Sequence, residues 1–209
     1  MIVYLMRHGE TDWNKERRLQ GQSDIPLNEF GIELAEETAR GLKEIPFQAA
    51  FSSPLQRAYV TAKIIIGDRA VPVITDDRLK EINFGPNEGE CFDRAKAEPN
   101  HPLHNFFCHP ERYEPVDGAE SLEDTAVRTK AFLREQILPL EGECEYVLVV
   151  AHGALNRSIL NTIAGIPEED FWKIELANCA VSILEVQNGE FSILEESRVY
   201  YKGAVNGRP

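Results

Sequence analysis

The chain has 209 residues with 43% apolar and 27% charged side chains, a composition typical of one globular domain. Its formal net charge of −13 repels nucleic acid and anionic membrane surfaces, so neither is an expected partner. The longest apolar runs, such as YVLVVA at 146–151, are far shorter than the roughly 20 residues that a membrane-spanning helix needs. An anionic substrate would need a local cluster of basic side chains, which makes the position of each arginine informative.

The first half of the chain alternates between predicted strands and helices. After Asn28, a suitable N-cap, apolar side chains recur at helical spacing, and the same spacing follows Pro54. In chain order, the predicted elements are strands at 2–6, 49–52 and 71–74, with helices at 29–45 and from Pro54 to Ile66.

Residues 86–120 lose this periodicity. The segment is rich in Pro, Gly, Asn and His, which predicts an irregular insert lying over another part of the molecule as a lid. Its aromatic side chains would either line that lid or attach the insert to the core. They are Phe92, Phe106, Phe107 and Tyr113.

Regular structure returns at Ser121, where Ser-x-x-Asp is typical of a capping box that opens a helix. The apolar run 146–151 predicts a fully buried strand, followed by a helix to about Ala164 with Gly165 as its C-cap. Asn188-Gly189 between two alternating runs predicts a closing hairpin, and residues 203–209 are expected to be a loose tail.

The strand runs are too uniformly apolar to have one solvent-exposed face, which indicates a sheet buried on both sides. With alternating helices, this predicts a three-layer α/β/α sandwich with a mostly parallel central sheet, formed by one domain over 1–209. Ligands of open α/β sheets bind beyond the carboxyl ends of the strands, so the residues delivered there are the candidates for function.

Those strand ends carry an unusual set of side chains. The first predicted strand ends in Arg7-His8, and the buried strand ends in His152. Arg57 lies in the first turn of the helix after the second strand, and Glu81 follows the third. Each residue alone is explained by an ordinary structural role, but four separate segments converging on one sheet edge favour a functional site.

The set suits phosphoryl transfer. Guanidinium groups bind phosphate oxygens in a planar, bidentate geometry, and a neutral imidazole between them is a nucleophile for the positioned phosphorus. A protonated second imidazole can stabilise the equatorial oxygens, and a carboxylic acid can protonate the leaving oxygen. We therefore expect neither a metal nor another cofactor. Because attack needs a neutral His8 and a protonated Glu81, activity should peak within a pH window.

The sequence resembles the histidine phosphatase superfamily, which includes cofactor-dependent phosphoglycerate mutases and many small phosphatases. The similarity extends from the first strand to the Asn178-Cys179 segment and implies the phosphoglycerate mutase-like fold. The motifs that carry it are Arg7-His8-Gly9-Glu10-Thr11, Leu19-Gln20-Gly21, Ser52-Ser53-Pro54-Leu55 with Arg57-Ala58, Leu79 with Glu81, and Val150-Ala151-His152-Gly153.

The resemblance implies a role for each matching residue. His8 would be phosphorylated, with its other ring nitrogen held by a backbone carbonyl, and Glu81 would act as general acid and then base. The catalytic residues would be His8, Glu81, Arg7, Arg57 and His152. The phosphate- and substrate-binding residues would be Asn14, Gln20, Gly21, Gly153 and Ala154.

Two departures from the family bear on the substrate. Asn87 stands where the family usually has a tryptophan, and the short insert has only isolated basic residues instead of the paired ones of phosphoglycerate mutases. These features favour a phosphatase acting on a small phosphorylated metabolite. A phosphoglycerate mutase and a non-catalytic phosphate-binding module are the alternatives, and the resemblance leaves a homodimer open.

Several other residues carry less information. The insert groups His101, His104, Cys108 and His109, but their spacing fits no closed zinc motif. Trp13 is interpreted as packing, and Trp172 carries no functional signal. Met1 leads directly into an apolar run without a signal-peptide pattern, and the four scattered cysteines indicate free thiols, so we expect a cytoplasmic location.

Overall fold

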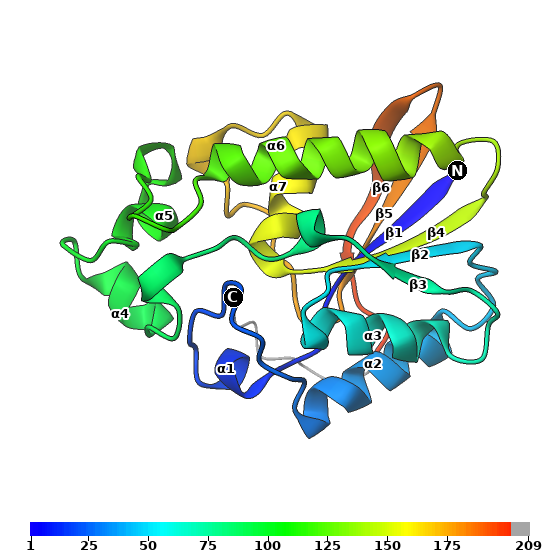
Figure 1. Cartoon of the computed structure of the whole chain (residues 1–209), viewed down its shortest axis with the longest axis horizontal. Coiled ribbons are helices and arrows are strands. Elements are labelled where there is room, and N and C mark those ends of the chain that lie inside the picture. Colours follow the sequence, from blue (N-terminus) through cyan, green and yellow to red (C-terminus); the bar gives the residue numbers. More distant parts are fainter. Residues whose placement is uncertain (202–209) are drawn as a thin grey trace.

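A computed structural model describes residues 1–201, in which helices cover both faces of a six-stranded sheet (Figure 1). The strands are β1 (Ile2–Arg7), β2 (Ala49–Ser52), β3 (Val73–Thr75), β4 (Tyr146–Ala151), β5 (Val181–Gln187) and β6 (Glu190–Arg198). In the order β3-β2-β4-β1-β5-β6, the first four are parallel, and β5 and β6 are antiparallel to their neighbours. The predicted α/β/α sandwich is confirmed. The predicted tail at 203–209 lies outside the described residues.

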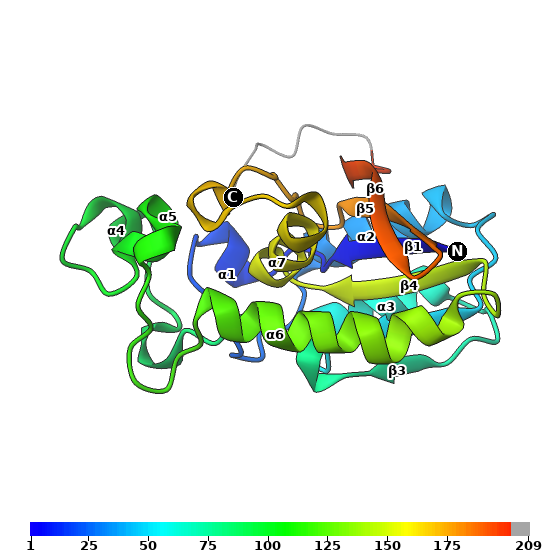
Figure 2. The same cartoon turned by 90° about the horizontal axis from the view of Figure 1, so that it is seen from above.

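The helices form the two outer layers and a group at one end of the sheet. They are α1 (Asp12–Lys15), α2 (Glu29–Gly41), α3 (Gln56–Ile66), α4 (Phe92–Ala97), α5 (His104–Cys108), α6 (Leu122–Phe132) and α7 (Gly153–Ala164). Helices α2 and α3 cover one face, and α6 and α7 cover the other (Figures 1 and 2). Within residues 1–201, none of these helices is long and apolar enough to cross a membrane.

The central strands are apolar on both faces because each face packs against a helical layer. In β1, Tyr4 and Met6 join the core beneath α2 and α3. Val3 and Leu5 point the other way, into the core beneath α6 and α7. This explains why the strand shows no alternation of polar and apolar residues, and it confirms the predicted burial on both sides.

Local signals fixed most element boundaries. The Asn28 side chain accepts a hydrogen bond from Gly31 N at 2.8 Å, as expected of an N-cap, and Ser121 with Asp124 forms the predicted capping box. Helix α2 ends at Gly41, earlier than the predicted residue 45, because glycine is a poor helix former. Pro46 also disfavours helical backbone at Ile45.

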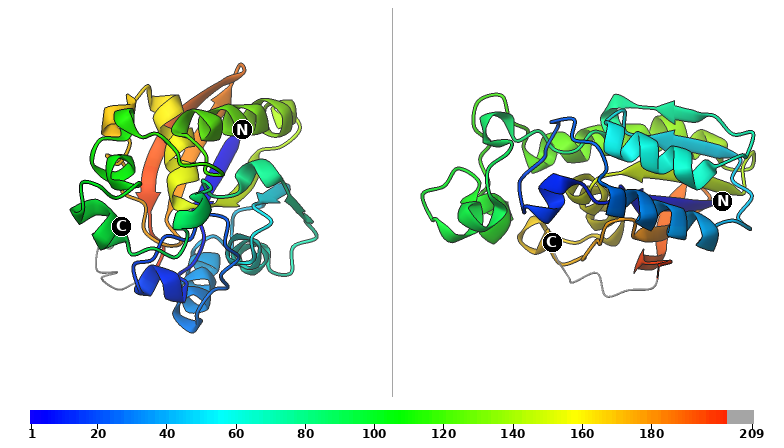
Figure 3. Two further views of the ribbon diagram at one scale, coloured as in Figure 1. Left: turned by 60° about the vertical axis from the view of Figure 1, so that its left-hand side comes forward. Right: turned by 90° about the horizontal axis from the view of Figure 1, so that it is seen from below.

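The insert is more ordered than predicted, since it contains α4 and α5. A cluster of aromatic rings attaches it to the rest of the domain: Phe106 makes edge contacts with Phe84, Phe107, Tyr113 and Trp172 at centroid distances of 5.0–5.1 Å. Figures 2 and 3 show this segment at one end of the molecule, beyond the carboxyl ends of β1 and β4.

Three of the four histidine and cysteine side chains grouped in the insert make contacts in and between its two helices. His104 Nδ1 lies 3.0 Å from Lys96 O, and Cys108 Sγ lies 3.6 Å from the same carbonyl oxygen. His101 Nδ1 accepts a hydrogen bond from Leu103 N at 3.1 Å. These contacts tie the end of α4 to α5.

Candidate active site

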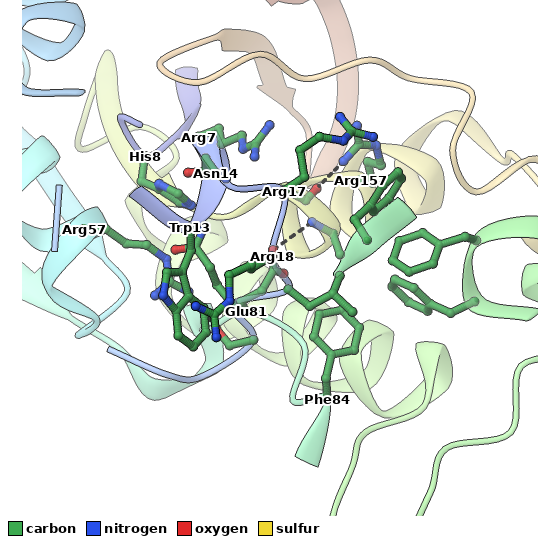
Figure 4. A pocket seen from close by; sticks show the side chains of 18 of the residues that line it. Arg7, His8, Trp13, Asn14, Arg17, Arg18, Arg57, Glu81, Phe84 and Arg157 are labelled. Atoms are coloured by element: carbon green, nitrogen blue, oxygen red, sulfur yellow. Dashed lines mark hydrogen bonds between the residues drawn. The ribbon is translucent and has the colours of Figure 1, made fainter. Parts of the chain in front are cut away.

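A pocket lies beyond the carboxyl ends of β1 and β4. Most of the predicted site residues line it: Arg7, His8, Asn14, Gln20, Gly21, Arg57, Glu81, Gly153 and Ala154. His152 lies behind them, with its ring centroid 5.2 Å from that of His8. The structure therefore brings together side chains from the four predicted segments (Figure 4).

His8 is held with one ring nitrogen free. Its Nδ1 lies 2.6 Å from Gly9 O, which fixes a proton on Nδ1 and leaves the Nε2 lone pair available. Asn178, on the chain before β5, donates to His8 O at 3.1 Å and to Gly9 O at 3.2 Å. The His8 side chain is 3% exposed, and burial together with the charges of Arg57 and Arg7 lowers the pKa of His8 well below 6.5.

Two glycines allow the His8 loop to approach helix α2. A Cβ atom on Gly31 would overlap the backbone of Glu10, and one on Gly9 would overlap Gly31 O. Only glycine permits this backbone contact, which fixes the loop that follows β1.

Arg57 is anchored by backbone carbonyls of an adjacent loop. Its Nη2 donates to Gly21 O at 2.6 Å, and its Nη1 donates to Ser23 O at 2.7 Å. Its Nε donates to His152 Nδ1 at 3.2 Å. The side chain is fully buried, and this burial lowers its pKa to about 10, so the guanidinium still carries its charge at neutral pH. Gly21 thus acts on Arg57 through its carbonyl group.

His152 is neutral in this arrangement, which differs from the protonated second imidazole expected from the sequence for the phosphate-bound site. Its Nδ1 accepts from Arg57, which requires an unprotonated nitrogen there. Burial and the nearby Arg57 charge lower its pKa well below 6.5. The proton therefore lies on Nε2, a buried atom with no hydrogen-bond partner among residues 1–201, which makes His152 a neutral donor.

Glu81 is bound at the amino end of α7. Its Oε2 accepts from Ala154 N at 3.0 Å, and its Oε1 accepts from Leu155 N at 2.9 Å. Ile82 N also donates to Oε1 at 3.0 Å. These three hydrogen bonds fix the orientation of the Glu81 carboxyl group at the pocket. The Ala154 amide, expected to bind phosphate, thus contacts Glu81 here, and its role toward phosphate stays a prediction.

Of the remaining predicted residues, Arg7 and Gln20 each have a buried polar atom without a hydrogen-bond partner among residues 1–201, whereas Asn14 is held by a helix cap. Arg7 Nη1 donates to Leu176 O at 2.5 Å, whereas its buried Nε has no partner among residues 1–201. Gln20 Oε1 is likewise buried without a partner in that range. Asn14 accepts from Thr11 N at 3.1 Å through Oδ1, which caps α1 and orients the amide.

The two lowered histidine pKa values predict how stability depends on pH. In the unfolded chain both imidazoles bind protons near pH 6.5, while in the folded chain they do not. The free energy of unfolding should therefore fall as the pH drops from 7.5 to 5, by up to about 1.4 kcal/mol per pH unit for each histidine. Urea unfolding across this range measures the slope, and His8→Ala should remove about half of it. A free energy that is constant or rises on acidification would contradict the assignment.

The sequence interpretation missed several residues that line the same pocket. They are Trp13, Arg17, Arg18, Leu19, Phe84, Arg157 and Trp172. Phe92, Phe106 and Phe107 of the insert also line it, in agreement with one of the two roles expected for these aromatic residues. Trp13, which was interpreted as packing, and Trp172, which carried no functional signal, therefore both line the pocket. One signal was available for Arg157: it follows Gly153 by four residues, and this spacing places both on one face of α7.

The fold and this pocket define a class of α/β proteins that bind phosphate at strand ends with paired imidazoles and buried arginines. Residues 3–197 match the histidine phosphatase superfamily (branch 1), and the chain belongs to this family. The resemblance seen in the sequence is confirmed.

Individual relatives carry different names. The probable phosphoglycerate mutase GpmB of Enterobacter sp. (strain 638) is 34% identical over 185 residues, which cover 88% of this chain and 85% of that protein. The structure of Bacillus stearothermophilus YhfR is similar with a TM-score of 0.86 at 30% identity, covering 95% and 97% of the two chains. A phosphoserine phosphatase from Entamoeba histolytica, solved with 3-phosphoglyceric acid, gives a TM-score of 0.81 at 27% identity over 95% and 97%.

Proposed function

We propose that this protein is a metal-independent phosphomonoesterase that hydrolyses a small phosphorylated metabolite through a phosphohistidine on His8. The observation that carries the proposal is the free Nε2 of His8, in a pocket where buried guanidinium groups of Arg7 and Arg57 lie beside it. These charges and the Nε2–H of His152 supply the stabilisation that phosphoryl transfer requires.

In the first half-reaction, the Nε2 lone pair of His8 attacks phosphorus while the bond from phosphorus to the ester oxygen breaks. The leaving oxygen takes a proton from the carboxyl group of Glu81. Arg7, Arg57 and His152 donate hydrogen bonds to the equatorial oxygens, and Nδ1–H of His8 remains on Gly9 O as the ring gains positive charge.

In the second half-reaction, the Glu81 carboxylate accepts a proton from water, whose oxygen attacks the phosphorus of phosphohistidine. The bond from phosphorus to Nε2 breaks, and inorganic phosphate leaves. Glu81 is again protonated and His8 is again neutral, so the cycle closes without a further reactant.

The side chains of the insert favour a phosphatase over a phosphoglycerate mutase. Its arginines point outward and are paired on the surface: Arg94 Nε lies 3.1 Å from Glu98 Oε1, and Arg112 Nε lies 3.2 Å from Glu111 Oε1. The insert instead contributes Phe92, Phe106 and Phe107 to the pocket. The alternative, a phosphoglycerate mutase, is supported by the names of the GpmB relatives.

The test is phosphate release from a panel of phosphomonoesters that includes 3-phosphoglycerate, measured in EDTA. We expect release from at least one ester and none from His8→Ala. Interconversion of phosphoglycerates with a bisphosphate primer, in the absence of phosphate release, would establish the mutase instead. Silence in both assays would overturn the proposed chemistry.

A further inference from the structure

The pocket contains a buried cation that the proposed chemistry does not use. Arg157 on α7 is 5% exposed and lines the pocket on the opposite side from His8 and Arg57 (Figure 4). Its Nε donates to Ile174 O at 2.8 Å and its Nη1 to Gly153 O at 3.2 Å. Nη2 has no hydrogen-bond partner among residues 1–201. No carboxylate of that range lies within 4 Å of the guanidinium, and Glu81 and Glu175 act on its charge only from farther away.

The other peripheral arginines of the pocket already have partners. Arg17 forms a bidentate pair with Asp93, with Nε–Oδ2 at 2.7 Å and Nη2–Oδ1 at 2.6 Å. Arg18 donates to Gly89 O at 2.9 Å and lies 3.3 Å from Glu16. Arg157 differs because it is buried and its positive charge is left without a paired anion, which is costly unless a ligand supplies one.

A second guanidinium increases this cost. The position of a Cβ atom on Gly153 would be 3.4 Å from Arg157 Nη1 and 3.5 Å from Arg7 Nε. The two like charges thus converge on one point of the pocket wall. Burial, and then the Arg7 charge, lower the pKa of Arg157 to about 10, although the carboxylates of Glu81 and Glu175 oppose this shift. An anion bound between the phosphate site and Arg157 would relieve this repulsion.

Aromatic side chains hold Arg157 in place. The Trp172 ring lies 4.8 Å from its guanidinium carbon, and Trp172 Nε1 donates to Phe106 O of the insert at 2.6 Å. The insert therefore positions Trp172, and Trp172 positions Arg157. Phe92 and Phe107, whose rings lie 4.5 Å apart, add apolar surface to the same pocket.

We infer that Arg157 is a second anion-binding site, so that the preferred substrate is a phosphomonoester whose leaving group carries another negative charge, a carboxylate or phosphate, close to an apolar or aromatic part. This inference rests on the proposed function for the identity of the first anion. In this inference Trp172 is a positioning residue for Arg157, and the insert influences substrate selection because Phe106 O holds Trp172.

The test compares binding of ester pairs that differ only in the second charge, in the His8→Ala background, where no turnover occurs. The pairs are 3-phosphoglycerate with glycerol 3-phosphate, and 3-carboxyphenyl phosphate with 3-(hydroxymethyl)phenyl phosphate. By isothermal titration calorimetry, we expect the charged member of at least one pair to bind about 10- to 100-fold more tightly. Arg157→Gln should reduce this ratio to about one and leave the affinity for the neutral member within a few-fold.

Arg157→Lys and Trp172→Phe cover the case in which Arg157→Gln does not fold. The lysine keeps the charge and should retain part of the ratio, while the phenylalanine loses the hydrogen bond to Phe106 O and should lower it. Arg17→Gln is the matched control, because its paired charge should not affect the ratio. Equal binding of both pair members, or a ratio that survives loss of Arg157, would overturn the inference. Loss of the ratio without any ester hydrolysis by the native enzyme would instead overturn the proposed function alone.

Discussion

Replacing His8 by alanine should lower kcat for every phosphomonoester by about 10⁴-fold or more, because the variant lacks the nucleophile that forms the covalent intermediate. The native side chain is 3% exposed and is held by Gly9 O, so its Nε2 is fixed in the pocket and no other residue is given the role of nucleophile. Steady-state phosphate release with a sensitive phosphate-binding dye measures the loss.

The intermediate itself gives a second readout. After rapid acid-free quenching, native enzyme mixed with radiolabelled ester should retain label on protein that is stable to alkali and lost in acid, as expected of phosphohistidine. His109→Ala is the matched control, since this imidazole is exposed in the insert and lies 4.0 Å from Glu111. It should label normally. Label on the His8→Ala variant would mean that another residue is the nucleophile.

The fold was predictable because its elements depend on local signals that are strong in this chain. Uniform apolar runs, the N-cap at Asn28 and the capping box at Ser121 each fix one element without reference to the rest. The order of strands in the sheet was not predictable in the same way, because it is decided by packing between residues far apart in the sequence. Pairing of β1 with both β4 and β5 is such a long-range choice.

The core of the site was predictable because parallel strands deliver their ends to one edge of the sheet. The state of His152 was not, since it depends on the direction in which Arg57 donates its Nε–H. The role of Arg157 was not predictable from the sequence for a related reason. An arginine inside a helix is ordinary in a sequence. Arg157 becomes notable only in the folded chain, where it is buried against Trp172 and has no carboxylate within ion-pair distance among residues 1–201.

Other aromatic residues line the pocket in place of the tryptophan that similar sequences usually have at the position of Asn87. Asn87 donates to Phe84 O at 3.4 Å in a short turn, and Phe84 itself lines the pocket beside the rings of α5. The aromatic wall is therefore present, but it comes from other positions. Its shape follows from how the insert packs against Phe84.

Replacing Glu81 by glutamine should slow the enzyme in a manner that depends on the leaving group. The amide cannot protonate the leaving oxygen, so alkyl esters should lose about 10²- to 10³-fold in kcat/KM. With 4-nitrophenyl phosphate, whose leaving group needs no proton, His8 should still be phosphorylated rapidly. Hydrolysis of the intermediate lacks its general base, so a burst of one nitrophenol per enzyme should precede slow turnover in stopped-flow measurements.

A control must separate this loss of proton transfer from damage to α7, since Ala154 N and Leu155 N both donate to Glu81 and a glutamine amide can accept from only one of them. The unmatched N–H should lower the free energy of unfolding by about 1–3 kcal/mol without changing the burst. Glu88→Gln is the matched variant: Glu88 accepts from Gln22 N and Ser23 N and supports the loop that holds Arg57. It should slow all esters to the same extent and give no burst. If Glu81→Gln behaves in that way too, Glu81 positions the site and another group moves the proton.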